Sequence, residues 1–174
     1  MTQKRFPTVQ ELFDLTGQVA FVTGGARNLG YDMALALAEA GADVCITSRK
    51  PADAARSAQQ IADSTGRRVL PVELDVAIED QVIAAVDKCL AEFGQIDILV
   101  NNAGNVVSTP ENAPIHKRPF EDWMNTISSN LNGTFLCSKH VLARSMIPRR
   151  TGKIINIGSI AGVIGRDRRV YEGT

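Results

Sequence analysis

The stretch from Val19 to Gly30 constrains the fold more than any other part of the sequence. A short apolar run, Val-Ala-Phe-Val, leads into the turn Thr-Gly-Gly-Ala-Arg-Asn, and an amphipathic helical pattern begins there. Gly24 lets the chain reverse without a Cβ, and Gly30 lets the helix backbone pack close to the strand. The free N–H groups of the first helical turn then face any bound anion. The sequence therefore predicts a strand–turn–helix unit that can hold a phosphate group.

Further apolar runs recur along the chain. They occupy residues 19–22, 44–47, 69–74, 96–100 and 153–157. Short, nearly continuous runs suit strands buried on both faces, as in a parallel sheet covered by helices. Helical patterns lie between them, and the first one predicts a buried stripe of Leu29, Met33 and Leu37. The alternation predicts an α/β fold, a doubly wound, Rossmann-like parallel sheet of about five strands.

Size, charge and cysteine content narrow the class of protein. The 174 residues, 44% of them hydrophobic, suit a single domain over residues 1–174. Nineteen basic and nineteen acidic residues balance, so we expect neither nucleic acid nor a membrane surface as a partner. Cys45, Cys89 and Cys137 are odd in number and lie in apolar patterns. They predict reduced thiols in the core and a cytoplasmic location.

The glycine turn does not match two common nucleotide-binding patterns. Gly25 and Gly30 have the spacing of a Walker loop, but Tyr31 and Asp32 follow where Lys and Ser or Thr are required. The pattern Gly-x-Gly-x-x-Gly is absent as well, since five residues separate Gly24 from Gly30. A phosphotransferase is therefore disfavoured, and a variant dinucleotide turn is the remaining interpretation.

Two other kinds of catalytic site are also disfavoured. A hydrolase nucleophile centred on Ser159 requires glycines at two positions, where Ile157 and Ala161 stand instead. His116 and His140 lie far from acidic or thiol partners, so we interpret them as surface or packing residues and expect no metal site.

Five ordered stretches together resemble one known family. Thr-Gly-x-x-x-x-Leu-Gly at 23–30 resembles the cofactor turn of the short-chain dehydrogenase/reductase family, which usually has glycine in place of Asn28. Asparagine tolerates left-handed backbone, so this departure is mild. The other four matches are Leu-Asp-Val at 74–76, Asn-Asn-Ala-Gly at 101–104, Asn-Leu-x-Gly-Thr-Phe at 130–135 and Ile-Gly-Ser at 157–159. The sequence is identified as resembling a member of this family.

The resemblance implies a bound nicotinamide dinucleotide. To the residues of these motifs we add Ser48 and Arg49 at the end of the second strand. The predicted cofactor-binding residues are then Gly24, Arg27, Asn28, Leu29, Gly30, Ser48, Arg49, Asp75, Val76, Asn102, Ala103 and Gly104. Taken singly, Asp75 is equally explained as a strand-end turn residue, and Asn101 with Asn102 as a turn pair without a ligand.

Basic residues favour NADP(H) over NAD(H). In this fold an acidic residue at the end of the second strand binds the adenosine ribose, whereas a basic one accommodates a 2′-phosphate. That strand ends at Ser48-Arg49, and Arg27 in the turn is a second cation able to reach the same phosphate. Asp43 precedes the predicted strand and so lies at the wrong end of the sheet. We predict NADP; NAD stays possible if Arg49 is only solvated and Arg27 only stacks on adenine.

The resemblance also implies a reaction. Family members transfer a hydride between nicotinamide and a small-molecule carbonyl or alcohol substrate. A Tyr acts as general acid or base, and a Lys four residues later favours its phenolate. By match, Ser159 hydrogen-bonds the substrate oxygen, and Asn130 holds a water that relays protons.

The position of the catalytic Tyr is open. Tyr171 is the only tyrosine after Ser159, and the sequence ends at Thr174, so the Tyr-x-x-x-Lys pair is incomplete. Either Tyr171 is the catalytic residue without its Lys, or residues 166–174 begin an insertion before the true pair. We favour the insertion, because Tyr171 is one residue closer to Ser159 than the family's usual spacing and Gly173 opens a helix poorly.

The incomplete pair bears on what these residues can do. Family members are longer, so we expect the cofactor-binding half of a protein, truncated after the fifth strand. The alternative function is cofactor binding without turnover. The helix from Phe120 matches half of the family's usual dimer contact, and we expect the parent protein to form a homo-oligomer.

Overall fold

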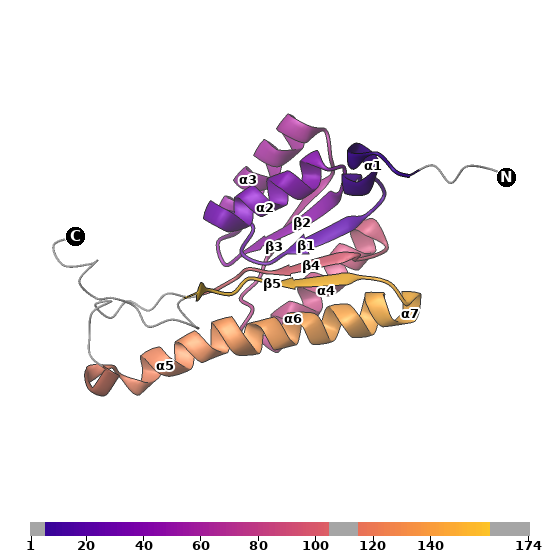
Figure 1. Cartoon of the computed structure of the whole chain (residues 1–174). Helices are drawn as coiled ribbons and strands as arrows, with labels where there is room; N and C mark the ends of the chain where they lie inside the picture. The colour runs from indigo at the N-terminus through magenta and orange to yellow at the C-terminus, as the bar shows by residue number, and fades with distance from the viewer. Residues whose placement is uncertain (1–5, 105–114, 161–174) are drawn as a thin grey trace.

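A sheet of parallel strands forms the centre of the molecule (Figure 1). The structure, a computed structural model, describes residues 6–104 and 115–160. Within them the sheet has five strands in the order β3-β2-β1-β4-β5, and every pairing is parallel. The strands are β1 Val19–Val22, β2 Asp43–Ser48, β3 Val69–Glu73, β4 Ile98–Asn101 and β5 Lys153–Asn156. The predicted α/β fold is confirmed.

Helices cover both faces of the sheet (Figure 1). Helices α2 (Asn28–Glu39) and α3 (Pro51–Thr65) pack on one face, and α4 (Glu79–Phe93) and α6 (Gly133–Val141) pack on the other. Successive residues of β1 alternate between the two cores, since Ala20 belongs to the first and Phe21 to the second. Burial on both faces explains why β1 reads as an unbroken apolar run.

Helix α2 buries a different stripe from the one predicted. Gly30, Ala34 and Ala38 are its buried residues, whereas Leu29 is 55% exposed and Met33 and Leu37 are half-buried. Apolar residues fill neighbouring stripes of this helix, so periodicity alone selected the larger side chains. The small residues face the strands because they let the helix axis approach the sheet closely.

The long helix that begins at Phe120 is interrupted twice. It consists of α5 (Phe120–Ile127), a π-helical turn η2 (Ser128–Asn132), α6, a second π-helical turn η3 (Leu142–Met146) and α7 (Ile147–Arg149). A π turn inserts extra residues and rotates the faces that follow it. The predicted helix from Phe120 is therefore present, but its faces are not those of one regular α-helix.

The far end of this helix is bonded to the segment that leads into β4 (Ile98–Asn101). In η3 the buried Ser145 hydroxyl accepts a hydrogen bond from Ile96 N (2.8 Å) and donates one to Ile96 O (3.0 Å). Arg149 pairs with Asp97 (Nη2–Oδ1 2.5 Å). Asp97 also accepts from Val19 N (2.8 Å), so these contacts join the helix to β1 and to the segment before β4.

Short elements flank the sheet, and the core thiols behave as predicted. They are α1 (Val9–Phe13), with a capping box between Thr8 and Glu11, and the 3₁₀ turn η1 (Ile115–Lys117).

The three cysteines are free and buried, which confirms the core thiols; burial raises the pKa of Cys137 to about 12. No helix in the described ranges is both long and apolar enough to cross a membrane.

Candidate functional site

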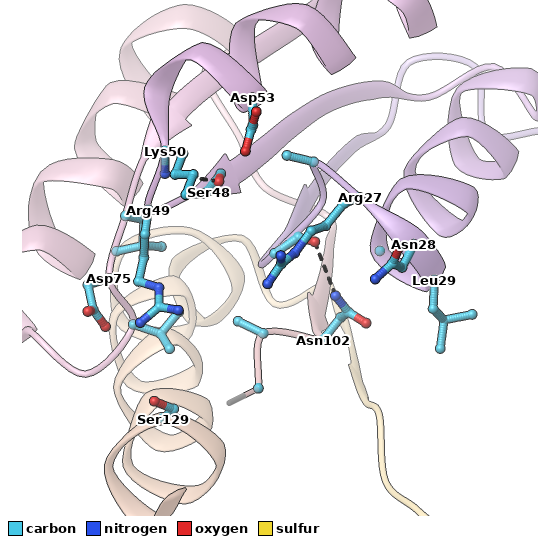
Figure 2. A pocket seen from close by; sticks show the side chains of 17 residues that line it. Arg27, Asn28, Leu29, Ser48, Arg49, Lys50, Asp53, Asp75, Asn102 and Ser129 are labelled. Carbon is cyan, nitrogen blue, oxygen red and sulfur yellow. Dashed lines mark hydrogen bonds between the residues drawn. The ribbon is translucent and has the colours of Figure 1, made fainter. Parts of the chain in front are cut away.

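A pocket of about 780 Å³ lies at the carboxyl ends of β1 and β2, where α2 begins (Figure 2). All twelve residues that the sequence assigned to the cofactor line it. Five further residues line it that the sequence reasoning did not name: Ala26, Lys50, Asp53, Leu74 and Ser129. Four of them adjoin a predicted residue and Asp53 lies four positions after Arg49, so adjacency to the strand ends was the available signal. A pocket at the carboxyl edge of a parallel sheet is the usual place for a ligand in such folds.

The glycine turn needs unusual backbone at two positions. Gly24 has φ +65° and Asn28 has φ +49°, both in the left-handed region. Asn28 stands where the family usually has glycine, and asparagine is among the few side chains that tolerate this conformation. The substitution therefore keeps the shape of the turn.

Gly30 closes the turn by packing against backbone. A Cβ added there would collide with the Gly24 carbonyl oxygen and lie 2.5 Å from Asn102 Nδ2. The first helical bond runs from Tyr31 N to Arg27 O (3.2 Å), so the N–H groups of residues 28–30 precede it. Arg27, at the N-cap, provides no side-chain cap for them. The start of α2 therefore offers backbone donors to an anion.

Side chains from other strands hold the turn in place. Asn102 Nδ2 donates to Thr23 O (3.0 Å) and to Gly24 O (3.3 Å). Figure 2 shows a hydrogen bond from Asn102 as a dashed line. The Thr23 hydroxyl accepts from the N–H groups of Asn102 (3.0 Å) and Ala103 (2.9 Å). Thr47 Oγ1 accepts from Gly24 N (3.3 Å). Through these bonds the Asn102 side chain shapes the pocket wall, while the alternative of an Asn101–Asn102 turn pair without a ligand stays open.

One end of the pocket is positively charged. Arg27, Arg49 and Lys50 line it, and Figure 2 shows the Arg27 guanidinium directed from the glycine turn into the pocket and the Arg49 guanidinium on the side where Asp75 is drawn. Asp53 also lines the pocket, but its carboxylate is paired with Arg56 (2.7 Å). Among the described residues, none of the three cations has a carboxylate within ion-pair distance. This end therefore suits an anionic group.

Asp43 lies at the opposite edge of the sheet. It is the first residue of β2, rather than the residue before the strand as predicted, and it pairs with Val19. Its carboxylate binds Arg67 (2.8 Å) and Arg68 (2.6 Å). Burial acts to raise the pKa of Asp43, but the hydrogen bonds from Arg68 and the charges of Arg67 and Arg68 outweigh it and lower the pKa. Asp43 therefore takes part in a structural ion pair away from the pocket.

The turn after β3 forms the wall opposite the glycine turn. Asp75 N donates to Gln81 Oε1 (2.8 Å), and Asp75 Oδ1 accepts from Ala77 N (3.0 Å). Asp75 is thus a turn residue and a pocket residue at the same time. Next to it, Val76 contacts Gly133 so closely that a Cβ at 133 would lie 2.6 Å from Val76 Cγ2.

Of the residues expected to carry out chemistry, Asn130 lies beside this pocket. Asn130 is in the π turn η2, and a Cβ at Gly104 would lie 3.2 Å from Asn130 Oδ1. Ser129, its neighbour, lines the pocket. Ser159 follows β5, is exposed and is not among the residues that line the pocket. Tyr171 lies outside the described residues, so its two interpretations stay predictions. π turns are frequent at functional sites.

Known proteins match both the sequence and the fold. The model of the family described as short chain dehydrogenase matches residues 18–171. A 2-dehydro-3-deoxy-D-gluconate 5-dehydrogenase of Formosa agariphila is 38% identical over 157 residues, covering 90% of this chain and 58% of that protein. A 3-oxoacyl-(acyl-carrier-protein) reductase of Synechocystis sp. is 38% identical over 151 residues, covering 87% and 59%. The chain thus spans less than two thirds of these relatives.

Solved structures agree with these sequence matches. A gluconate 5-dehydrogenase from Burkholderia cenocepacia, in complex with NADP and tartrate, is 40% identical with a TM-score of 0.82. That comparison covers 91% of this chain and 60% of the other. A short-chain type dehydrogenase/reductase from Mycobacterium marinum has a TM-score of 0.84 at 36% identity, covering 92% and 63%. By the extent of these matches, the chain belongs to the short-chain dehydrogenase family.

Proposed function

We propose that the chain binds NADP(H) in the pocket at the start of α2, and that its parent protein is an oxidoreductase acting on a carbonyl or alcohol. The observation that carries the proposal is the packing of Gly30 against Gly24 and Asn102. It leaves a backbone cradle, with helical N–H donors, at the edge of a pocket large enough for a dinucleotide.

The preference for NADP(H) over NAD(H) is supported by charge. Arg27, Arg49 and Lys50 line one end of the pocket, and the acidic Asp53 there is paired with Arg56. An arginine presents a planar set of donors that matches phosphate oxygens. Asp43, the acidic residue about twenty positions beyond the turn, is held by two arginines at the other edge and does not offer a carboxylate to a ribose.

The proposed catalytic groups act around the nicotinamide end. A bound nicotinamide supplies or accepts the hydride. Ser159 donates a hydrogen bond to the substrate oxygen as charge develops on it. Asn130, beside Gly104, holds a water that relays a proton. The general acid or base is a tyrosine, either Tyr171 or one beyond residues 166–174.

A second candidate function concerns the 174 residues by themselves. They contain no Lys four positions after Tyr171. A tyrosine with its usual pKa near 10 is about one-thousandth ionised at pH 7, so it is a poor base without such a partner. We propose that this sequence alone binds the cofactor and does not turn substrate over.

The experiment that tests the proposal is a calorimetric titration of the chain with NADPH and, separately, with NADH. We expect NADPH to bind about tenfold more tightly, a difference of about 1.4 kcal/mol. Equal dissociation constants overturn the NADP preference, and absence of binding by both overturns the function. Consumption of NADPH with a panel of ketones and aldehydes overturns the second candidate.

Assembly and location are proposals as well. We propose a cytoplasmic homo-oligomer that associates along the exposed apolar side chains of α5, η2 and α6. The residues are Phe120, Trp123, Leu131 and Phe135. The buried free thiols support a reducing compartment. Sedimentation of the parent protein tests the assembly, and a monomer at micromolar concentration contradicts it.

A further inference from the structure

A serine on α3 reaches the glycine turn from outside the pocket. Ser57 is 4% exposed, and its hydroxyl donates a hydrogen bond to the Ala26 carbonyl oxygen at 2.8 Å. A serine inside a helix commonly bonds a carbonyl of its own helix, as Ser64 of α3 does with Ile61 O (3.1 Å). Ser57 instead joins two elements that lie 31 positions apart in the sequence.

The bond fixes one peptide plane in the turn. The peptide that contains the Ala26 carbonyl also contains the Arg27 N–H, and in a trans peptide these two groups point in opposite directions. Holding the carbonyl on Ser57 therefore aims the Arg27 N–H away from α3. A rotation of this peptide would turn a carbonyl oxygen toward a bound anion in place of a donor.

The same bond links the two sides of the charged end. Helix α3 follows Arg49 and Lys50 directly, and Arg27 follows the peptide that Ser57 holds. We propose that Ser57 is a positioning residue for the dinucleotide pocket, which keeps the glycine turn in the orientation that binds the pyrophosphate of the cofactor. This inference rests on the proposed function and assigns to it a residue that does not line the pocket.

The effect of removing the hydroxyl follows from burial. Ser57→Ala leaves the Ala26 carbonyl without its donor in a buried position, and a buried unpaired carbonyl is costly. Rotation of the Ala26–Arg27 peptide, which would let the carbonyl oxygen find another partner, then becomes more favourable. Since NADPH and NADH share the pyrophosphate, both should lose affinity, whereas a change at Arg49 should affect NADPH alone.

The experiment compares three variants of the full 174-residue chain with wild type. Calorimetry measures the dissociation constants for NADPH and NADH; urea unfolding and the ¹H–¹⁵N spectrum of the turn amides are recorded beside it. We expect Ser57→Ala to weaken binding of both coenzymes about tenfold and to shift the Arg27 amide resonance. Ser57→Thr, which keeps the hydroxyl, should stay within about threefold of wild type. Ser64→Ala, which removes a hydroxyl–carbonyl bond from the same helix, should change neither affinity nor the turn amides.

The outcomes separate this inference from the function on which it rests. If wild type binds and Ser57→Ala binds equally well, the positioning role is overturned and the proposed function stands. The same holds if Ser57→Ala only lowers the urea midpoint, or if Ser57→Thr binds as weakly as Ser57→Ala. If wild type binds neither coenzyme, the proposed function itself fails.

Discussion

The glycine-turn side of the molecule and the β5 side are built in opposite ways. Around the turn, the side chains of Thr23, Thr47 and Ser57 are buried and bonded to backbone groups of neighbouring elements. Along β5 and the helix beside it, large apolar side chains are exposed, with Phe120 at 74% and Ile160 at 72%. Figure 1 shows β5 at the edge of the sheet next to this helix.

The difference separates two properties of the chain. The glycine turn is held by hydrogen bonds among the described residues. Asn130 and Ser159, two of the proposed catalytic residues, are exposed in this part of the chain. Cofactor binding and turnover should therefore respond to different mutations.

The largest expected effect comes from a mutation on the glycine-turn side. Gly30→Ala places a Cβ against the Gly24 carbonyl oxygen and Asn102 Nδ2, so the turn must move. The Gly24 oxygen belongs to the backbone, and moving Asn102 Nδ2 breaks its hydrogen bonds to Thr23 O and Gly24 O. We expect the NADPH dissociation constant to rise at least about 100-fold, or about 2.7 kcal/mol, as measured by calorimetry.

The matched control lies on the open side. A Cβ added to Gly158 meets nothing within 4 Å, and that glycine has no positive φ. Gly158→Ala should leave NADPH affinity within about twofold of wild type, a change below about 0.5 kcal/mol. Equal losses in the two variants would contradict the contrast between the sides.

A second prediction concerns the contact between Gly133 and Val76, where the long helix meets the pocket wall. Gly133 lies directly after η2, and a Cβ there would meet Val76 Cγ2 at 2.6 Å and Val76 Cβ at 2.9 Å. Gly133→Ala should push the helix away from the pocket wall. Overpacking of this kind costs about 2 kcal/mol, which corresponds to about 30-fold in NADPH affinity if it is all expressed in binding.

A compensating change tests the cause. Val76→Gly in the Gly133→Ala background removes both colliding atoms. We expect calorimetry to recover most of the NADPH affinity, so that the double variant binds more tightly than Gly133→Ala. A double variant that is weaker still would mean that the helix is not positioned by this contact.

A third prediction concerns the charged end alone. Arg49→Gln removes one cation from the pocket without adding volume. A hydrogen bond to a charged group contributes about 1.5 kcal/mol, so NADPH should bind about tenfold more weakly. NADH, which lacks the 2′-phosphate, should bind as before. A parallel loss for both coenzymes in the two titrations would assign Arg49 to a part of the cofactor that they share.

The sequence predicted the glycine-turn side well for a physical reason. Its residues are local to strand ends, and strand ends are marked by the change from apolar runs to Gly, Asn, Asp and Ser. Asn28 at φ +49° was predictable as well, because few other residues replace glycine in a left-handed position. The carboxyl edge of the sheet then brings these separate stretches together.

The parts that the sequence missed depend on long-range packing. The π turns η2 and η3 leave no signal in an apolar pattern whose period is close to that of a regular helix. The bond from Ser57 to Ala26 O joins residues 31 positions apart, and a serine within α3 carries no mark that distinguishes it from Ser64. The ion pair between Arg149 and Asp97 likewise joins residues that lie far apart in sequence.

The smallest effect should come from the edge of the sheet opposite the pocket, where Asp43 binds Arg67 and Arg68. The folded state lowers the pKa of Asp43, so the stabilisation is present above the unfolded value, near pH 4, and is lost as the pH falls through the folded pKa. Asp43→Asn should therefore unfold more easily in urea at pH 7, by about 1 kcal/mol, and this difference should shrink as the pH falls through the folded pKa of Asp43. Asp87→Asn, which breaks an exposed pair with Arg144, should lose less. NADPH affinity should be unchanged in both, because neither residue lines the pocket; a loss of affinity in Asp43→Asn would show that the two edges of β2 are coupled.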